Sequence, residues 1–465
     1  MSIDLTLDRI QRLARHLPTY TRPTCHIAGT NGKGSVSALV SSMLASSTPP
    51  LSVGRFNSPH LVSVNDCIVI NNESVSSEVY EAARAEVVRA DKEHGIGVSS
   101  FELLTLTAFL IFEQAKLDVV VLEVGMGGRL DATNIIADEC VLVSALTAVD
   151  LDHQAFLGPS VSAIAAEKAA IARKGTPFVL GGQPHPEVEA VVAAIVTAAE
   201  AEPLYALPVF PRAWDPALDG PEPPPFSLSA TPFVPPSPSP VRFAMPCFDH
   251  PVSALLPLPG AHQFDNLALA ASVVSAVLMN PAWAAVRARF TPAAIAEGVR
   301  RTAWPGRLSF HALDTPRVRM LADGAHNPAS AQTLAAYLAE LLEGTARPLA
   351  LTLVLALSHS PPKTPRETLA PLLAIAGQAG ADVGVALLRF SPPEGMPWVR
   401  AVPPAELHAV VEELAPGTET RVYGDEPDAL RHALEWAAGR QDARDGLVVL
   451  AGSLYLVADF YRLAM

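Results

Sequence analysis

Cysteine and charge are both scarce in this 465-residue chain. The four cysteines, Cys25, Cys67, Cys140 and Cys247, form no CxxC pair, which argues against a disulfide scaffold and a thiolate zinc site. Charged residues make up only 17%, and the net charge is −14 at pH 7. We therefore expect no nucleic-acid partner, and a site for an anionic substrate must gather its cations locally.

The sequence also lacks the long hydrophobic runs of membrane proteins. No stretch of about 20 apolar residues is free of charge and proline. The opening, MSIDLTLDRIQRLARHL, has early acidic residues and the apolar spacing of an amphipathic helix, which is not typical of a signal peptide. These absences, together with unpaired cysteines, predict a cytoplasmic protein without a membrane partner.

Hydrophobic residues are plentiful at 49%, and the length is natural for two domains. Apolar runs typical of buried parallel strands (TCHIAG, LDVVVLEVG, CVLVSALTAV, TPFVLGG) alternate with helix-like segments, one of which is expected to end at Lys174-Gly175. A second alternation begins near residue 309. The pattern predicts the α/β class, with a domain junction within residues 301–307.

Residues 203–247 interrupt this pattern with many prolines and serines, as in PEPPPFSLSATPFVPPSPSP. We interpret them as a surface insertion, partly disordered and outside any core, so that deletion of residues 216–240 should spare activity. A proline-rich ligand for a partner domain is the alternative.

The stretch HIAGTNGKGS is typical of a phosphate-binding loop. Glycines between a strand and a helix let backbone N–H groups converge on an anion, and the helix adds the positive end of its dipole. Lys33 can reach the β and γ phosphates, and Thr30 or Ser35 can lie near Mg²⁺. The glycines lie closer to the lysine than in the standard Walker pattern, and a glycine-rich turn is the alternative.

Three further residues stand where parallel strands end or a helix follows. Glu123 closes the strand DVVVL, where a carboxylate is well placed for Mg²⁺. His153 follows the next strand, and Lys168 lies in the helix-like IAAEKAAI. Taken singly, His153 could be structural and Lys168 could extend its amine to water.

Together the motifs resemble the folylpolyglutamate synthase and dihydrofolate synthase family, a branch of the Mur ligases, and look especially like its fungal dihydrofolate synthases. The matching stretches, in family order, are HIAGTNGKGS, FNSPHL, FELLTLTAF, LEVGMGGRLDATN, LDHQAFLG, IAAEKAAI, LPGAHQFDNLALA, WPGRL, DGAHNPAS and GSLYL. The resemblance implies a P-loop ATPase-like domain over residues 1–300, with a parallel sheet, and a Rossmann-like glutamate-ligase domain over residues 301–465.

The resemblance also implies the reaction. ATP would phosphorylate the carboxylate of 7,8-dihydropteroate, and the amine of L-glutamate would displace phosphate from the acyl phosphate, giving dihydrofolate. Folylpolyglutamate synthesis on reduced folates, or both activities, remains an alternative. A P-loop NTPase that ligates nothing and an inactive relative are further alternatives. The family favours a monomer.

Roles for single positions follow from the same resemblance. ATP is expected to contact Thr30, Asn31, Gly32, Lys33, Gly34, Ser35, Asn266, Arg307 and Asp323. Two Mg²⁺ sites would involve Ser58, Glu123 and His153. The pterin substrate would contact Phe101, Glu102, Arg129, Leu130, Asp131 and Ala132. The catalytic residues would be Lys33, Lys168 and His326.

Lys168 matches the lysine that is carbamylated in this family, which would turn a cation near the metals into an anion; an unmodified lysine contacting the acyl phosphate is the alternative. Two departures from the family pattern stand out. Asn65-Asp66-Cys67-Ile68 lacks an arginine that could hold a substrate carboxylate, which disfavours a long polyglutamate substrate. Ala170 replaces a glycine, which should be harmless in a helix.

Overall fold

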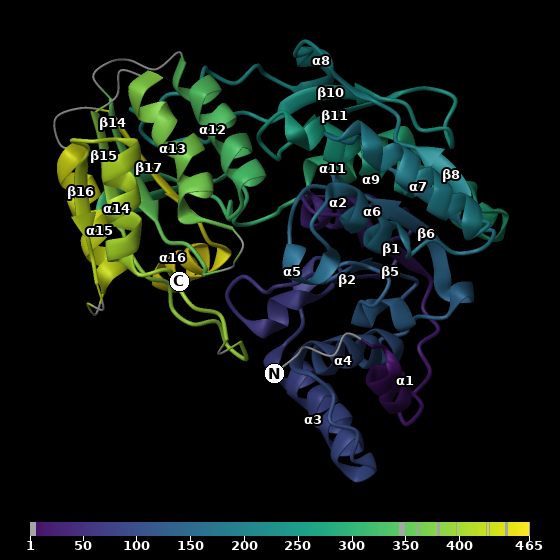
Figure 1. The fold of residues 1–465 in the computed structure, drawn as a ribbon. Coiled ribbons are helices and arrows are strands. Elements are labelled where there is room, and N and C mark those ends of the chain that lie inside the picture. The colour runs from purple at the N-terminus through teal and green to yellow at the C-terminus, as the bar shows by residue number, and fades with distance from the viewer. Residues whose placement is uncertain are drawn as a thin grey trace. The chain divides into compact units, whose positions relative to one another are not determined.

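The computed structural model describes residues 6–343, 349–359, 361, 363–378, 382–396, 398–424, 426, 428–441 and 445–464. The chain divides into two compact units. The first comprises the chain up to residue 215 with residues 239–257 and 262–303, and the second comprises residues 216–238, 258–261 and 304 onward. Each unit is an α/β structure, as the sequence predicts (Figure 1).

The first unit is built on an eight-stranded sheet in the order β4-β3-β2-β5-β1-β6-β7-β8. The six strands from β2 to β8 in this order pair in parallel, and β3 and β4 add an antiparallel edge. The strands are β1 Thr24–Ala28, β2 Val53–Phe56, β3 Ile68–Ile70, β4 Glu73–Ser74, β5 Val119–Glu123, β6 Val141–Leu146, β7 Pro177–Leu180 and β8 Glu202–Tyr205. Both β1 and β5 are buried at every residue, as their unbroken apolar sequences predict.

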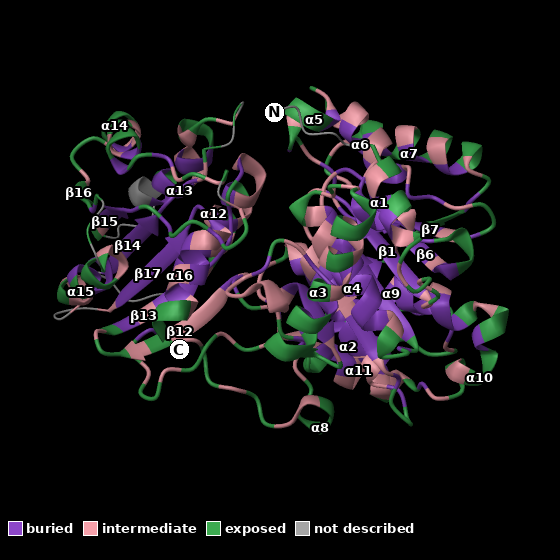
Figure 2. Cartoon of the chain, turned by 90° about the horizontal axis from the view of Figure 1, so that it is seen from below, coloured by how far each residue is buried: buried purple, intermediate pink, exposed green. Residues whose placement is uncertain are grey.

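Helices cover both faces of this sheet. One face carries α2 Lys33–Ala45, α9 His262–Met279 and α11 Pro292–Arg300. The opposite layer holds α1 Asp8–Ala14, α3 Ser77–His94, α4 Ser100–Gln114, α6 Val161–Ala169 and α7 Pro186–Ala198. The short helices are α5 Gln154–Leu157 and α10 Ala284–Arg287. Figure 2 shows the buried residues concentrated on the strands and the inner helix faces.

Helix α6 ends earlier than the sequence analysis expects. It stops at Ala169 and not at Lys174-Gly175. The chain turns at Ala170, so that the carbonyl of Ile171 accepts a hydrogen bond from the hydroxyl of Ser144 in β6, at 2.9 Å. This bond ties the end of α6 to the sheet, and it leaves Lys168 in the last turn of the helix.

The second unit holds a six-stranded sheet in the order β12-β13-β17-β14-β15-β16, parallel except for the β12–β13 hairpin. Its strands are β12 Ser309–Asp314, β13 Arg317–Ala322, β14 Ala350–Leu355, β15 Asp382–Leu387, β16 Glu419–Val422 and β17 Gly446–Ala451. One face carries α12 Pro328–Glu343, α13 Pro365–Gln378 and α14 Pro404–Leu414, and the other carries α15 Ala429–Gln441 and α16 Leu454–Ala464.

The interpretation of residues 203–247 as a surface insertion outside any core is wrong for two parts of the segment. The strands β9 Val209–Pro211 and β10 Ser239–Phe243 join β11 Val252–Leu256 in a three-stranded antiparallel sheet of the first unit. Between them, beyond the short α8 Pro216–Asp219, the chain packs on the second unit.

Leu228 is the most buried residue of this packing. It belongs to the hydrophobic core of the second unit, and only 5% of its surface is exposed. The rings of Phe226 and Phe233 lie 5.7 and 6.4 Å from the ring of Phe310, and the guanidinium of Arg319 lies 5.1 Å from the Phe233 ring. Apolar residues spaced between prolines therefore bury themselves although the composition is typical of a linker. This removes the basis for expecting that deletion of residues 216–240 is harmless.

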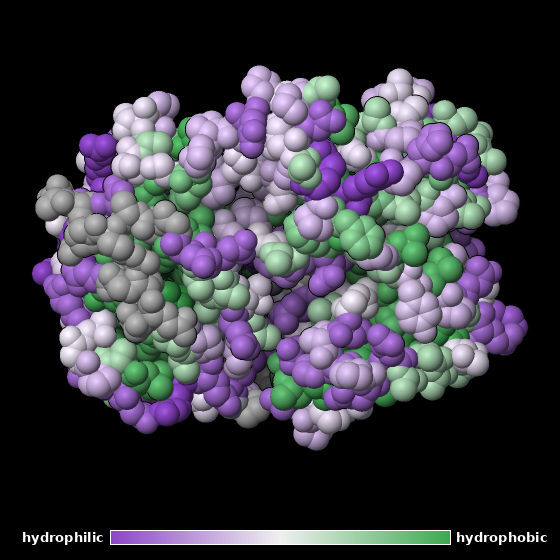
Figure 3. Space-filling view, turned by 90° about the horizontal axis from the view of Figure 1, so that it is seen from above, coloured by the Kyte–Doolittle hydropathy of each residue, from purple (hydrophilic) through white to green (hydrophobic). Residues whose placement is uncertain are grey.

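Among the described residues, no single helix is long and apolar enough to cross a membrane. One bent pair, His262–Met279 with Pro281–Arg287, meets the criterion by length and composition alone, but α9 is mostly buried inside its unit. Hydrophilic and hydrophobic residues are intermixed on the face shown in Figure 3.

Replacement of Leu228 by alanine tests the packing of the proline-rich segment. Leu228→Ala should lower the free energy of unfolding by about 2 to 3 kcal/mol, because it removes a buried side chain and leaves a cavity. Leu218→Ala in the same segment is the control, because Leu218 is 57% exposed and should change stability by less than about 0.5 kcal/mol. Urea unfolding of both variants measures this, and equal stabilities would contradict the packing.

Candidate active site

The glycine-rich loop that the sequence predicts to bind phosphate joins β1 to α2 at the carboxyl edge of the central sheet. Gly32 is the N-cap of α2 with φ +94°, and a Cβ there would lie 2.3 Å from Oδ1 of Asn266. The backbone N–H groups of Thr30 and Asn31 donate to the carbonyl of Ala148, which fixes the loop against the segment after β6. The first N–H groups of α2 have no acceptor within the helix, which is the arrangement that anions bind at helix N-termini.

Two lysine amines meet at one carbonyl oxygen of this loop. Nζ of Lys33 donates to the carbonyl oxygen of Gly29 at 3.1 Å and to that of Thr30 at 3.2 Å. Nζ of Lys168, from α6, donates to the same Gly29 oxygen at 2.8 Å. Burial and the charge of Lys33 lower the pKa of Lys168 to about 7, so that the neutral amine is accessible at physiological pH.

Glu123 brings a buried carboxylate to the same edge. It is 5% exposed at the end of β5, and its Oε1 lies 3.9 Å from Nζ of Lys33. Its Oε2 accepts a hydrogen bond from Nδ2 of Asn57 at 2.5 Å. Arg55, on the neighbouring strand β2, is a second cation close enough to Glu123 for the carboxylate to oppose the lowering of the arginine pKa by burial.

The expected metal ligands are not all gathered by the structure. Ser58 follows Asn57 directly, next to the partner of Glu123. His153 is the N-cap of α5 with φ +51°, its side chain is 45% exposed, and its Nε2 lies 3.8 Å from Oδ2 of Asp152. Within the described ranges, no three His, Cys, Asp or Glu side chains are close enough to hold a metal ion. Glu123, a buried hard-oxygen donor with Ser58 nearby, fits a divalent cation.

The loop after β5 is braced by a buried network. Oδ1 of Asp131 accepts hydrogen bonds from the backbone and the hydroxyl of Thr133, at 3.0 and 2.5 Å, and Oδ2 accepts from the backbone of Met126 at 2.8 Å. The hydroxyl of Thr133 also lies 2.9 Å from Nε2 of the buried His26. Asp131 therefore shapes the loop of Leu130 and Ala132 through its backbone contacts.

The other expected substrate contacts have visible partners inside the first unit. Arg129 forms an ion pair with Glu167, from Nη2 to Oε1 at 2.9 Å. Glu102 caps the start of α4 in a capping box with Ser99, and its Oε2 lies 3.3 Å from Nη2 of Arg9. The ring of Phe101 lies against the next loop, because a Cβ at Gly125 would come within 2.3 Å of its Cζ.

Sequence reasoning missed residues that support the predicted ones. Asn57 holds Glu123, and Gln263 donates to Oγ of Ser35 at 3.4 Å while it accepts from Asn266 at 2.9 Å. Each lies inside a stretch quoted for the family, FNSPHL or HQFDN, but no pattern in the sequence shows which residues touch. The Asn65-Asp66 departure caps a short 3₁₀ helix with Ser63.

Arg307, Asp323 and His326 belong to the second unit. Asp323 is buried at the end of β13, and its two oxygens accept from the backbone N–H groups of Leu308 and Ala325, both at 2.8 Å. Burial raises the pKa of Asp323, and Arg307 opposes that shift. Nδ1 of His326 lies 2.8 Å from the carbonyl oxygen of Gly324, so Asp323 and His326 belong to one turn after β13.

Comparisons with known proteins identify relatives of the chain. Residues 306–463 match the family model described as dihydrofolate synthetase, C-terminal domain. The chain is 34% identical over 471 aligned residues to the dihydrofolate synthetase of Saccharomyces cerevisiae, covering 100% of this chain and 98% of the relative.

Two solved structures are similar in fold to nearly the whole chain. The folylpolyglutamate synthase of Mycobacterium tuberculosis complexed with ADP is 29% identical with a TM-score of 0.78, covering 99% of this chain and 95% of that one. Escherichia coli FolC in complex with DHPP and ADP is 26% identical with a TM-score of 0.74, covering 100% and 94%.

The conformation of Gly32 gives a direct test of the phosphate-binding loop. Gly32→Ala should weaken ATP binding roughly 10- to 100-fold, because a positive φ strains alanine by about 1 to 3 kcal/mol and the new Cβ would collide with Asn266. Gly439→Ala is the matched control, since a Cβ there meets nothing within 4 Å. Calorimetric titration with ATP measures both; unchanged affinity in Gly32→Ala would exclude this loop as the nucleotide site.

Proposed function

Because the chain belongs to the folylpolyglutamate synthase and dihydrofolate synthase family, we propose that it joins L-glutamate to the carboxylate of 7,8-dihydropteroate, with conversion of ATP to ADP and phosphate. The observation that supports this chemistry is the arrangement of Lys33, Lys168 and Glu123 around the Gly29 carbonyl. It places cations and a carboxylate beside a phosphate-binding helix.

The reaction needs activation of a carboxylate, which is a poor electrophile. An oxygen of the dihydropteroate carboxylate attacks the γ-phosphorus of ATP, the bond to the β,γ-bridging oxygen breaks, and ADP leaves. The amine of glutamate then attacks the acyl phosphate carbon, phosphate leaves with the bonding electron pair, and the amine loses a proton. The protein accelerates both steps by positioning and by neutralising charge.

Residues of the first unit supply these effects. The N–H groups of Gly34 and Ser35 and the amine of Lys33 bind the phosphates, where Lys33 stabilises negative charge that develops on the transferred group. Asn266, held by Gln263, lies against Gly32 and fixes the loop at its tightest point. Thr30 and Asn31 anchor the loop to Ala148.

Glu123, Ser58 and His153 would hold Mg²⁺ beside the phosphates. When bound, the metal ions would supply Lewis-acid stabilisation of phosphate charge, and a structure of a relative from Yersinia pestis contains Mn with AMPPNP. Glu123 fits this role because it is a buried carboxylate at the carboxyl edge of a parallel sheet, balanced by Lys33 and oriented by Asn57. His153 fits less directly, since its side chain is 45% exposed and its Nε2 lies 3.8 Å from Oδ2 of Asp152.

Lys168 is proposed to carry a carbamate. Its neutral amine attacks the carbon of CO₂ and releases a proton to solvent, which converts a cation into an anion. Two features support this: Lys168 is 3% exposed, and it shares the Gly29 oxygen with Lys33, so that two ammonium groups at this point repel each other. An anion here would pair with Lys33 and remove that repulsion.

The pterin would lie near Phe101 and the loop of Leu130 to Ala132, which the Asp131 network holds in place. Dihydropteroate is favoured over a long polyglutamate because the stretch at Asn65-Asp66 carries no arginine and instead forms local bonds; Nδ2 of Asn65 donates to Oγ of Ser77 at 2.9 Å. Glu102 and Arg129 would act by fixing α4 and α6.

Arg307, Asp323 and His326 would contribute to nucleotide and glutamate binding from the second unit. Asp323 fastens Leu308 to the end of β13, so it positions Arg307 on the chain beside it. We further propose a monomer located in the cytoplasm. The four cysteines are free thiols and all are buried, which suits a reducing compartment.

The acceptor assay tests the proposed function. The purified protein is given ATP, Mg²⁺ and L-glutamate, with either dihydropteroate or tetrahydrofolate, and ADP release and the glutamylated product are measured. We expect product from dihydropteroate only. Product from tetrahydrofolate alone would overturn the dihydropteroate assignment, and ADP release without any glutamylated product would indicate an NTPase that does not ligate.

Lys168→Ala tests the carbamate. Turnover should fall about 100-fold, as for loss of a residue that supports a metal site, and short carboxylic acids should restore part of it by occupying the vacated space. Wild-type protein in ¹³C-bicarbonate should show a carbamate resonance that Lys168→Ala lacks.

The resonance should weaken as the pH falls below about 7, because the amine is then protonated. Lys174→Ala, at an exposed lysine of the same segment, is the control and should keep both signal and activity. A wild-type protein without the resonance at pH 8 would exclude the modification.

A further inference from the structure

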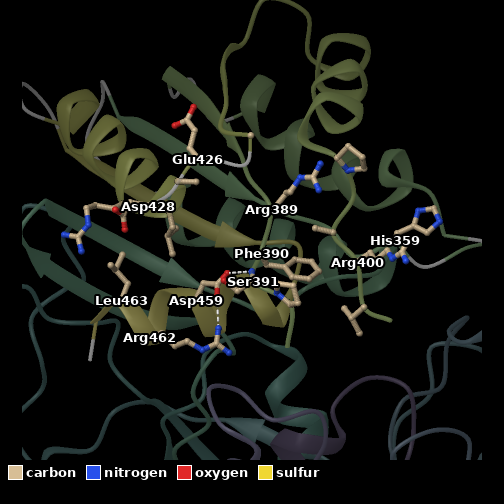
Figure 4. Close-up of a pocket in the computed structure, with 18 residues that line it drawn as sticks. His359, Arg389, Phe390, Ser391, Arg400, Glu426, Asp428, Asp459, Arg462 and Leu463 are labelled. Carbon is tan, nitrogen blue, oxygen red and sulfur yellow. Dashed lines mark hydrogen bonds and ion pairs between the residues drawn. The ribbon is translucent and has the colours of Figure 1, made fainter. Parts of the chain in front are cut away.

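Charged side chains of both signs line a cavity of about 1010 Å³ in the second unit (Figure 4). Among the described residues, four arginines and three carboxylates belong to its lining. One of the carboxylates, Asp459, accepts a hydrogen bond from Nη1 of Arg462 at 2.7 Å. This mixture favours no single class of ligand, whereas a buried set of polar side chains in the first unit has a defined arrangement.

That set consists of His26 in β1, Thr133 in the 3₁₀ helix η2 Ala132–Ile135, and Asp131, the N-cap of η2. His26 and Thr133 have no exposed surface, and Asp131 is 4% exposed. Nε2 of His26 lies 2.9 Å from Oγ1 of Thr133, which lies 2.5 Å from Oδ1 of Asp131. We call these three residues the His26 relay, and it joins β1 to the loop after β5.

The acceptors of the relay fix where its hydrogens lie. Oδ1 of Asp131 also accepts from the backbone of Thr133 at 3.0 Å, and Oδ2 accepts from the backbone of Met126 at 2.8 Å. Burial raises the pKa of Asp131, but both of its oxygens act as acceptors, as in a carboxylate. The single hydroxyl hydrogen of Thr133 therefore points to Asp131, and Nε2 of His26 must donate to Thr133.

His26 is suited to be a fixed donor because its ring stays neutral. Burial and the charge of Arg173 lower the pKa of His26 to about 3. A neutral imidazole has one N–H group. Nδ1 has no hydrogen-bond partner within the described part of the chain, so the hydrogen is used at Nε2. The relay thus runs in one direction, from His26 through Thr133 to Asp131.

The position of His26 in β1 connects two parts of the site. Three residues after His26, the same strand leads to Gly29, whose carbonyl oxygen accepts from Lys33 and Lys168. At its other end the relay reaches Asp131, which fixes the backbone of Met126. The proposed reaction requires a carboxylate to meet the γ-phosphate in a narrow range of positions, so the pterin loop and the phosphate loop must be held in register.

We propose that His26 is a positioning residue for the dihydropteroate subsite, an inference that rests on the proposed function. Its Nε2–H directs the hydroxyl of Thr133 to Asp131, and Asp131 holds the loop of Leu130 to Ala132 in the conformation that receives the pterin. His26 is fully buried, so it acts through this loop and does not touch the substrate. Loss of the relay should therefore weaken use of dihydropteroate and spare ATP.

Substitution of His26 tests the donor. His26→Phe keeps a buried ring but has no N–H group, whereas His26→Gln retains a donor close to the position of Nε2. The KM for dihydropteroate should rise about tenfold in His26→Phe, as expected for loss of one buried hydrogen bond, and by less than about threefold in His26→Gln. The KM for ATP should stay within about twofold of wild type in both variants, because the relay does not reach the phosphates.

Substitution of Thr133 tests the relay without a change of ring. Thr133→Val keeps the shape and removes the hydroxyl, so it should raise the KM for dihydropteroate about tenfold, and Thr133→Ser should restore it. His26→Phe combined with Thr133→Val should raise this KM no more than the larger single effect, because both break one relay. Thr352→Val is the matched control: Thr352 in β14 is fully buried, and its hydroxyl has no partner among the described residues.

Steady-state kinetics of the full-length variants, together with urea unfolding, decide the outcome. A KM for dihydropteroate within twofold of wild type in both His26→Phe and Thr133→Val, with only stability lowered, would mean that the relay is structural and overturn the proposal. An equal rise in the KM for ATP, or additive effects in the double variant, would also overturn it. If wild-type protein ligates no acceptor, the proposed function fails, and calorimetric affinity for dihydropteroate then replaces KM in the same comparison.

Discussion

The carbonyl oxygen of Gly29 accepts hydrogen bonds from the amines of both Lys33 and Lys168, and much of the site depends on this shared acceptor. Burial of Lys168 disfavours its charged form, and the ammonium of Lys33, bound to the same oxygen, adds repulsion. The pKa of Lys168 therefore falls to about 7. A lysine that is neutral at this point can become an anion by taking up CO₂, and the site then gains a partner for Lys33.

That shared acceptor exists only because several elements end at one edge of the first sheet. β1 delivers Gly29, β5 delivers Glu123, and α6 delivers Lys168 from the last turn before it ends at Ala169. Gly29 itself has no room for a side chain, since a Cβ there would lie 1.7 Å from Oγ1 of Thr147. Packing of the loop against the segment after β6 thus fixes the carbonyl that orients both lysines.

Sequence patterns predict the parts of this site that depend on local chemistry. The buried parallel strands, the glycine loop before α2 and the carboxylate that ends β5 all follow from apolar runs and their boundaries. The contacts of Asn57 and Gln263 could not be predicted, because they join segments distant in the sequence. The prediction for residues 203–247 was wrong because it relied on their high proline content. The packing of Phe226, Leu228 and Phe233 depends on a surface formed by other parts of the chain, which composition does not reveal.

The central claim is that the chain activates a carboxylate by phosphorylating it, and isotope transfer tests this most directly. Dihydropteroate labelled with ¹⁸O in its carboxylate is incubated with the protein, ATP, Mg²⁺ and L-glutamate, and the released phosphate is examined by mass spectrometry. An acyl phosphate requires one labelled oxygen to pass from the carboxylate to the phosphate in each turnover. Phosphate that carries no label, although dihydrofolate is formed, would contradict the mechanism.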